Sequence, residues 1–375
     1  MSYEETNMKS DVENEFLSVE KGQEWNSFFN AIRDECSRIY DYTSLEAKKP
    51  KNKDLNRYRD VYPYDHSRII LSRGPTDYIN ANLVVVDKAK RKYILTQGPL
   101  PQTTSHFWLM IWDQNCRAIV MLNRIIEKHV IKCHQYWPTA DHSGEESSII
   151  CNDVNLKVTN ISEEKNSCYT TTKLRFHFKY DKQEAAPPRI LFFALQTFKN
   201  AIVDSYRLED MKTGEQREVI HYHCTTWPDF GVPQSPTAFL KFLYAVRASG
   251  ALDNAGPTVV HCSAGIGRSG TFCLVDSCLV MIQDMKLTNI VVKDILIEMR
   301  KYRMGLIQTW GQLRFSYLAI IKGIDKAELE NGCPDDADEV NEVESEDEAP
   351  PLPPPRNESL HHREGVVKNG KVVSV

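Results

Sequence analysis

Two residue types at a fixed spacing give the clearest sign of chemistry in this sequence. Cys262 and Arg268 lie six positions apart in the segment HCSAGIGRSG. A short apolar run precedes the segment and another follows it, so we expect a strand, a glycine-rich turn over 263–270 and a helix over 271–285. Such a turn can point its backbone N–H groups inward while an arginine closes the ring around an oxyanion. The spacing therefore predicts a phosphate-binding cradle.

The same cradle would activate the thiol of Cys262. A cysteine beside a cation and a helix N-terminus readily loses its proton, so we expect a thiolate at neutral pH. The thiolate can attack phosphorus in line while Arg268 and the loop amides stabilise the equatorial oxygens. Ser269 can donate its hydroxyl to the sulfur and help it leave in a second step. The loop residues expected to surround the phosphate are Ser263, Ala264, Gly265, Ile266 and Gly267.

Two other interpretations of this segment have to be weighed. Residues 265–270 also form the G-x-G-x-x-G pattern of dinucleotide sites. That fold needs a second parallel strand ending in an acidic residue about 20 positions on, whereas Asp284 lies within the expected helix. A buried structural cysteine is the other alternative, because Cys and Arg at this spacing are a weak pattern alone.

Composition narrows the class of protein. The 375 residues, 41% of them hydrophobic, suit one large domain with an appendage. A net charge of -5 and a pI near 6.2 argue against a nucleic-acid binder. The start MSYEETNMKS lacks the features of a secretory signal, and the ten cysteines include no C-x-x-C pair, so we expect a reducing compartment. No apolar run approaches the roughly 20 residues of a membrane span. We therefore expect a cytoplasmic protein without a membrane anchor, with the nucleus as the alternative.

The chain divides into a folded domain over 1–326 and a tail over 327–375. Between positions 328 and 348 there are eleven acidic residues and no Lys or Arg, so the tail should be disordered. Pro351-x-x-Pro354-x-Arg356 has the form of an SH3 ligand, or alternatively of a stiff linker. For the domain we expect the α/β class, with a mixed, highly twisted sheet flanked by helices.

Further segments resemble those of the non-receptor protein tyrosine phosphatases, most closely the subfamily of phosphatase 1B and T-cell phosphatase. They are NRYRD (56–60), YPYDHSR (62–68), DYINAN (77–82), YILTQGPLPQ (93–102), VMLNR (120–124), QYWP (135–138), TWPDFG (226–231) and RKYRMGLIQ (300–308). The resemblance implies hydrolysis of phosphotyrosine in proteins through a phosphocysteine, without metal or organic cofactor. It also implies a monomer that acts on kinases and receptors and down-regulates tyrosine-kinase signalling.

The resemblance assigns roles to residues outside the loop. Expelling a tyrosinate requires a proton donor on a mobile segment, and Asp229 matches that acid, which then serves as the base for water. Gln308 matches the residue that positions the water, and Gln312 matches a neighbour that contacts the phosphoryl group. The supporting residues are Glu127, which orients Arg268, Lys132 beside the acid segment, and His261. Without the resemblance these residues would be interpreted as a helix cap, surface amides, surface charges or core.

Specificity for phosphotyrosine would come from the depth of the pocket, which only a long aryl ester can fill. By resemblance, Tyr58 forms one wall, Phe230 lies opposite, and Asp60 grips the backbone amides of the peptide. A second, non-catalytic aryl-phosphate site would consist of Arg33, Arg300, Met304 and Gly305. Paired phosphotyrosines, as on kinase activation loops, would then bind with added avidity.

Two features depart from the family pattern. Residues from about 173 to 204 have the look of an insertion of about 30 residues, and Trp310 puts a bulky indole at the expected mouth of the pocket. Either one leaves open a phosphotyrosine-binding scaffold that turns over poorly. A dual-specificity or lipid phosphatase is a further alternative, although it would not need the segment 56–60.

Overall fold

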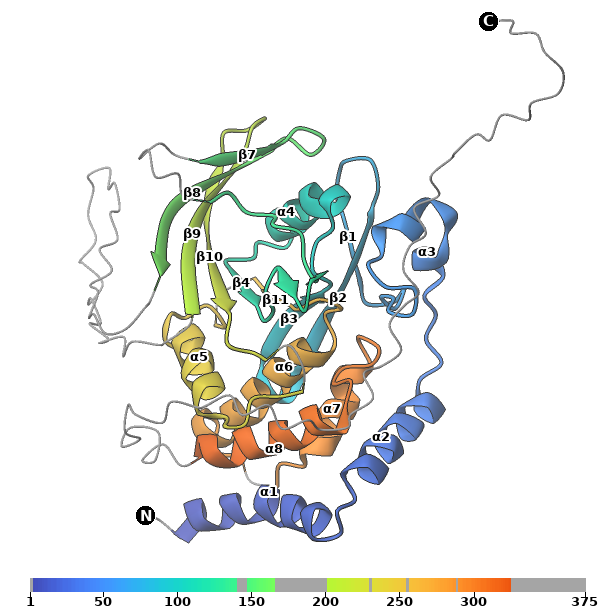
Figure 1. Ribbon diagram of the computed structural model, residues 1–375, viewed down its shortest axis with the longest axis vertical. Helices are drawn as coiled ribbons and strands as arrows, with labels where there is room; N and C mark the ends of the chain where they lie inside the picture. The colour runs from blue at the N-terminus through green and yellow to red at the C-terminus, as the bar shows by residue number, and fades with distance from the viewer. Residues whose placement is uncertain are drawn as a thin grey trace, which may run out of the picture. The chain divides into compact units, whose positions relative to one another are not determined.

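The central strands, Ala118–Met121 and Thr258–His261, are buried at every position, so both faces of the sheet must be covered. The computed structural model describes residues 3–139, 147–165, 201–228, 231–253, 256–287 and 289–324. Within them a nine-stranded sheet has the order β1-β2-β3-β11-β4-β10-β9-β8-β7 (Figure 1). The strands are β1 Arg68–Ile70, β2 Tyr78–Val86, β3 Arg91–Thr96, β4 Ala118–Met121, β7 Ser148–Cys151, β8 Leu156–Lys165, β9 Ala201–Asp210, β10 Gln216–Cys224 and β11 Thr258–His261. A separate hairpin consists of β5 Ile126–Glu127 and β6 Val130–Ile131.

The middle of the sheet is parallel. β11 pairs in parallel with β3 and β4, and β10 pairs in parallel with β4. The outer pairs on both sides are antiparallel. Parallel strands are normally covered on both faces, so their residues are apolar on both sides of the sheet. Val259 faces one hydrophobic core and Val260 the other, as the strand periodicity of two requires.

Helices cover the two faces unequally. They are α1 Tyr3–Lys21, α2 Trp25–Ile39, α3 Leu45–Lys48, α4 Thr104–Asp113, α5 Thr237–Ala248, α6 Gly267–Leu279, α7 Val292–Arg300 and α8 Trp310–Ile324. The larger core packs α1, α2 and α5 to α8 against one face, and the smaller core packs α4 against the other (Figure 1). The mixed sheet flanked by helices confirms the fold class predicted from the sequence.

Helix α1 was not expected from the sequence, and polar contacts attach it to α8. Arg314 makes a two-pronged ion pair with Glu20, with Nη2 to Oε1 at 2.5 Å and Nε to Oε2 at 2.9 Å. The indole Nε1 of Trp25 donates to the same carboxylate at 2.5 Å. The Arg314 hydrogen bond lowers the pKa of Glu20 from its usual value, so the carboxylate is ionised at neutral pH.

Two boundaries differ from those predicted. Helix α6 begins at Gly267 instead of position 271, so Arg268 lies in its first turn. The glycines after Cys262 suggested a longer turn than the chain makes, because only Gly265 among them has a positive φ. The expected insertion also overlaps the sheet, since its last four residues, 201–204, belong to β9 and pair with β10. Its remainder, 173–200, and the tail 327–375 lie outside the described residues.

Candidate active site

The loop that carries Cys262 is a tight connection from the end of β11 to the start of α6. Gly265 has φ +71°, and a Cβ at this position would lie 2.0 Å from the carbonyl oxygen of Thr96. Any other residue would therefore clash with β3 and would be strained as well. The backbone of the loop consequently lies directly against the carboxyl end of the neighbouring strand.

Arg268 is held in a fixed plane by Glu127. Its Nη1 and Nη2 donate to Oε1 and Oε2 of Glu127 at 2.6 and 3.0 Å, in the bidentate geometry that suits a guanidinium and a carboxylate. The same nitrogens donate to the carbonyls of Leu122 and Pro228, both at 3.1 Å. Four of the five N–H donors are thus used. Glu127 is 3% exposed, so this ion pair is shielded from water.

Cys262 is buried, with only 4% of it exposed. The hydroxyl of Ser269 is fully buried as well, and it makes no hydrogen bond to a described residue, Cys262 included. A buried hydroxyl without an acceptor is costly, and a thiolate within reach would provide one. The donation of Ser269 to the sulfur of Cys262 stays a prediction.

His261 supports the loop from the core side. Its Nδ1 donates to the carbonyl of Cys262 at 3.1 Å, because a carbonyl can only accept. Its Nε2 therefore accepts from the hydroxyl of Tyr136 at 2.8 Å. Burial lowers the pKa of His261 to about 3, so the ring is neutral. His261 thus holds the backbone of the nucleophile and supplies no charge.

One wall of the expected pocket is attached to the loop. The hydroxyl of Tyr58 lies 2.7 Å from that of Ser263, which in turn donates to the carbonyl of Lys132 at 2.8 Å. Burial raises the pKa of Tyr58, which keeps the phenol protonated. Tyr58, the loop and Lys132, which directly follows the hairpin of β5 and β6, are thereby joined in one hydrogen-bonded group. Lys132 takes part through its backbone, and its place beside the acid segment stays a prediction.

The two glutamines lie against the same loop. A Cβ at Gly267 would be 2.5 Å from Oε1 of Gln308 and 3.0 Å from both amide atoms of Gln312. The side chain of Gln312 also accepts from the backbone N–H of Gln308 at 2.9 Å, which fixes one amide relative to the other. The lack of a side chain at position 267 therefore lets both amides approach the loop.

Asp229 and Phe230 lie outside the described residues, but their neighbours are well placed. The Trp227 ring is 2% exposed and packs edge-on against Phe315 at 5.7 Å. Its Nε1 donates to the carbonyl of Gly231 at 3.3 Å, which ties together the two sides of the segment. Arg268 bonds the carbonyl of Pro228, the residue directly before Asp229.

Comparison with known proteins agrees with this geometry. Residues 52–322 match the protein-tyrosine phosphatase family. The tyrosine-protein phosphatase non-receptor type 61F of Drosophila melanogaster is 47% identical over 351 residues, which are 91% of this chain and 57% of the relative. The human tyrosine-protein phosphatase non-receptor type 2 is 47% identical over 317 residues, 84% of this chain and 66% of the relative. The rat protein of the same name is 48% identical over the same share of each chain.

The chain belongs to the protein-tyrosine phosphatase family. This confirms the resemblance identified from the sequence. The chain spans 57% of the Drosophila relative and 66% of the human one.

The residues predicted to form a second aryl-phosphate site are placed unequally. Arg33 is exposed on α2, whereas Arg300 is only 4% exposed and donates to the carbonyls of Leu306 and Ile307. Burial lowers the pKa of Arg300, and the charge of Arg33 adds to that effect, so the two cations are near each other. Gly305 is exposed with φ +62°. Met304 accepts from the backbone N–H of Tyr62 through its sulfur at 3.4 Å. The second site stays a prediction.

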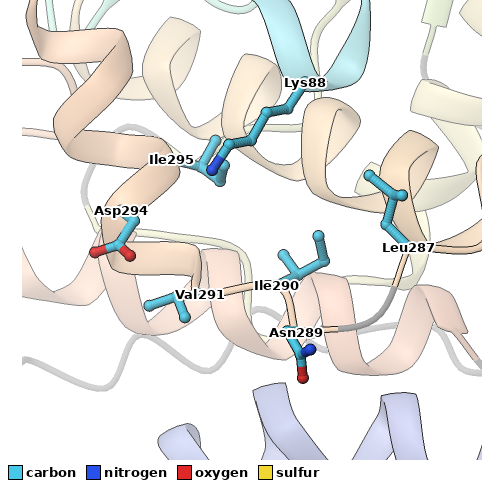
Figure 2. A pocket seen from close by; sticks show the side chains of 7 residues that line it. All are labelled: Lys88, Leu287, Asn289, Ile290, Val291, Asp294 and Ile295. Atoms are coloured by element: carbon cyan, nitrogen blue, oxygen red, sulfur yellow. The ribbon is translucent and has the colours of Figure 1, made fainter.

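Other expectations concern the rim and the rest of the surface. Asp60 is exposed, as a residue that grips a peptide should be. Trp310 begins α8 and packs partly buried against the larger core. A pocket of about 240 Å³ lies elsewhere and contains none of the predicted site residues; it is lined by Lys88, Leu287, Asn289, Ile290, Val291, Asp294 and Ile295 (Figure 2). No helix in the described ranges is long and apolar enough to cross a bilayer.

Several residues that build the site were not predicted. Tyr136 lies in a segment quoted for the resemblance, but nothing indicated that its hydroxyl bonds His261. Arg57 lies beside Tyr58 and donates to the carbonyls of Gly98, Ile131 and Pro99. Arg303 bonds the carbonyls of the loop itself. Both arginines lie in strongly charged segments, 54–60 and 300–303, so nothing in the sequence distinguished them from surface charges.

Proposed function

We propose that this chain hydrolyses phosphotyrosine in proteins through a phosphocysteine on Cys262. The observation that carries the proposal is the geometry around Arg268. Glu127 holds the guanidinium flat in the first turn of α6, and the loop from Cys262 to Gly267 connects it to the buried thiol. A planar cation and a row of backbone amides around a nucleophilic sulfur suit a phosphoryl group with three terminal oxygens.

The reaction proceeds in two steps, formation and hydrolysis of the phosphocysteine. In the first, the sulfur of Cys262 attacks phosphorus, the bond to the tyrosyl oxygen breaks, and Asp229 gives its proton to that oxygen. In the second, water positioned by Gln308 attacks phosphorus and gives a proton back to Asp229. The sulfur–phosphorus bond breaks, Ser269 donates a hydrogen bond to the departing thiolate, and inorganic phosphate is released.

The position of Tyr58 and the names of the relatives support this substrate class. The hydrogen bond between the hydroxyls of Tyr58 and Ser263 holds the Tyr58 ring beside the loop. A phosphotyrosine ring can stack on it, whereas phosphoserine is too short to reach a sulfur that is 4% exposed. The relatives from Drosophila and human are named as tyrosine-protein phosphatases.

Alanine at Asp229 tests the mechanism. The full chain should release phosphate from a phosphotyrosine peptide, and Asp229→Ala should lower kcat on the order of 10²-fold, since general acid catalysis is removed. Peptide affinity should be retained, because the cradle is untouched. Phosphate release and peptide binding by calorimetry measure the two effects.

Two outcomes would overturn the proposal. Binding of the peptide by the wild type without phosphate release would make the chain a scaffold. Hydrolysis of phosphoserine peptides or phosphoinositides at rates comparable to phosphotyrosine would favour a dual-specificity or lipid phosphatase.

Signalling partners and compartment form the finer part of the proposal. We place the protein in the cytoplasm, where it would oppose tyrosine kinases and bind SH3 domains through 351–356, which lies outside the described residues. The PxxPxR order of this segment favours SH3 recognition, because polyproline II is pre-extended and the arginine meets an acidic pocket. A Pro351→Ala, Pro354→Ala variant should lose retention on immobilised SH3 domains. Equal retention of variant and wild type would refute the SH3 assignment.

A further inference from the structure

Arg303 lies behind the cysteine loop and bonds its backbone. The side chain is 0% exposed. Its Nε donates to the carbonyl of Gly265 at 2.9 Å and its Nη2 to that of Ala264 at 3.1 Å. Two successive carbonyls of the loop are therefore drawn to one guanidinium. Because these carbonyls point toward Arg303, the backbone N–H groups of the loop can point to the opposite side, where a phosphate needs donors.

The other donors of Arg303 go to neutral amides of β2. Nη1 donates to Oδ1 of Asn82 at 2.8 Å and Nη2 to Oδ1 of Asn80 at 2.9 Å. The Nδ2 of Asn80 donates to the carbonyl of Val61 at 2.8 Å, and that of Asn82 donates to the hydroxyl of Ser67 at 2.9 Å. These bonds fix both amides with their oxygens toward Arg303. The asparagines accept from the cation without cancelling its charge.

Two other arginines that are shielded from water have acidic partners, since Arg91 pairs with Asp276 and Arg268 pairs with Glu127. The buried Arg300 instead donates to the carbonyls of Leu306 and Ile307. No salt bridge to Arg303 is present within the described ranges. Burial lowers the pKa of Arg303 to about 10, which still leaves it protonated at neutral pH. A full positive charge is therefore buried behind the loop.

The charge of Arg303 acts on a site with several titratable neighbours. They are Arg57, Tyr58, Cys133, His221, His223, His261, Arg268, Cys273 and Glu127, with Tyr78 next to Arg303. Asp276 also acts on Cys273. Among the described residues both of these carboxylates are matched by cations, Glu127 by Arg268 and Asp276 by Arg91 and Arg247. Burial keeps the tyrosines and His261 neutral.

We propose that Arg303 is a positioning residue of the phosphate loop, which orients the carbonyls of Ala264 and Gly265 and supplies an uncancelled positive charge behind Cys262. The idea rests on the proposed function only for its catalytic consequence. The thiolate and an incoming phosphate are both anionic, so one buried cation favours both. Neutral partners are needed because a carboxylate at position 80 or 82 would remove this effect.

Three variants separate charge from geometry. Arg303→Gln removes the charge, Arg303→Lys keeps the charge but not the fork, and Asn82→Asp keeps an acceptor but adds a negative charge. The reactivity of Cys262 toward iodoacetate, followed against pH in the full chain, reports the thiolate without requiring turnover. Arg303→Gln and Asn82→Asp should shift the acidic limb upward by about one pH unit, a tenfold slower reaction on that limb. Arg303→Lys should shift the acidic limb less than half as far. Its fold increase in KM should exceed its fold decrease in the rate of alkylation.

Arg217→Lys is the matched control. Arg217 also donates to a backbone carbonyl, that of Trp112 at 2.8 Å, but it lies on β10 six residues before His223. His223 of β10 and His261 of β11 both pair with Met121, so the end of β10 at His223 is the one level with Cys262. Six residues of extended strand place Arg217 about 20 Å from that end. This variant should leave the alkylation profile and KM unchanged.

The outcomes distinguish the proposal from a structural role. An unchanged alkylation profile in Asn82→Asp, folded by its melting transition, would overturn the idea even if Arg303→Gln does not fold. A shifted profile in a chain that releases no phosphate would support the role of Arg303 and refute the proposed function instead. A shift of the same size in Arg217→Lys would show that the effect is not specific to the loop.

Discussion

Serine at position 262 is expected to abolish phosphate release while the phosphotyrosine peptide still binds. The change replaces sulfur by oxygen in a side chain of nearly the same size, so the cradle keeps its shape. A hydroxyl is not ionised in this field as a thiol is, and the nucleophile is lost. We expect kcat to fall by at least about 10⁴-fold. Phosphate release and calorimetric peptide binding, measured on the same preparation, check both parts.

A second buried cysteine provides the control for this change. Cys151 is 5% exposed and lies on β7, the strand at the far edge of the sheet. Cys151→Ser should lose some stability and keep the kcat of the wild type. Turnover in Cys262→Ser within tenfold of the wild type would rule out a phosphocysteine. Loss of peptide binding in this variant would show that the thiol is needed for the shape of the site.

Lysine at position 268 should have the second largest effect, lowering kcat by about 10³ to 10⁴-fold. The change keeps the charge but replaces a planar fork of donors by a point charge. The new side chain cannot hold both oxygens of Glu127 and two oxygens of a phosphoryl group. Each lost donor to the transition state costs about 10²-fold or more. Steady-state kinetics on a phosphotyrosine peptide measure the loss.

Glu127 provides the internal comparison for Arg268. Glu127→Gln removes the charge of the buried acceptor and should cost about 10 to 100-fold, since Glu127 acts only by orienting the arginine. The double variant should lose less than the product of the two single losses, because both act on one group. Strictly multiplicative losses would show that Glu127 contributes independently of Arg268.

The parts of the site whose residues lie close together in the chain could be predicted from the sequence. The strand before Cys262, the tight turn and the helix after it follow from local apolar runs and glycines, and the structure has all three. The start of the helix at Gly267 was not predicted, because turn chemistry at Gly265 and helix propensity compete over a few residues. The resemblance supplied the long-range pairing of Glu127 with Arg268, which lie 141 positions apart.

Contacts built on backbone carbonyls could not be predicted in this way. Arg303 and Arg57 bond main-chain oxygens, which are present at every position and leave no pattern in the sequence. The hydroxyl of Tyr136 likewise meets His261 only because β11 brings the two together. Helix α1 escaped prediction because its short apolar face is completed by α8, nearly 300 positions away.

The use of four N–H donors by Arg268 couples ligand binding to the segment before Asp229. Nη1 and Nη2 are both fully occupied by Glu127, Leu122 and Pro228. A phosphate that takes two donors from this guanidinium needs one besides Nε. The partners outside the ion pair are the carbonyls of Leu122, directly after β4, and of Pro228, of which only Pro228 belongs to the acid segment. Occupancy of the cradle and the position of Pro228 are then linked equilibria with one shared free energy. The free energy by which release of the Pro228 carbonyl strengthens ligand binding equals the free energy by which a bound ligand favours that release.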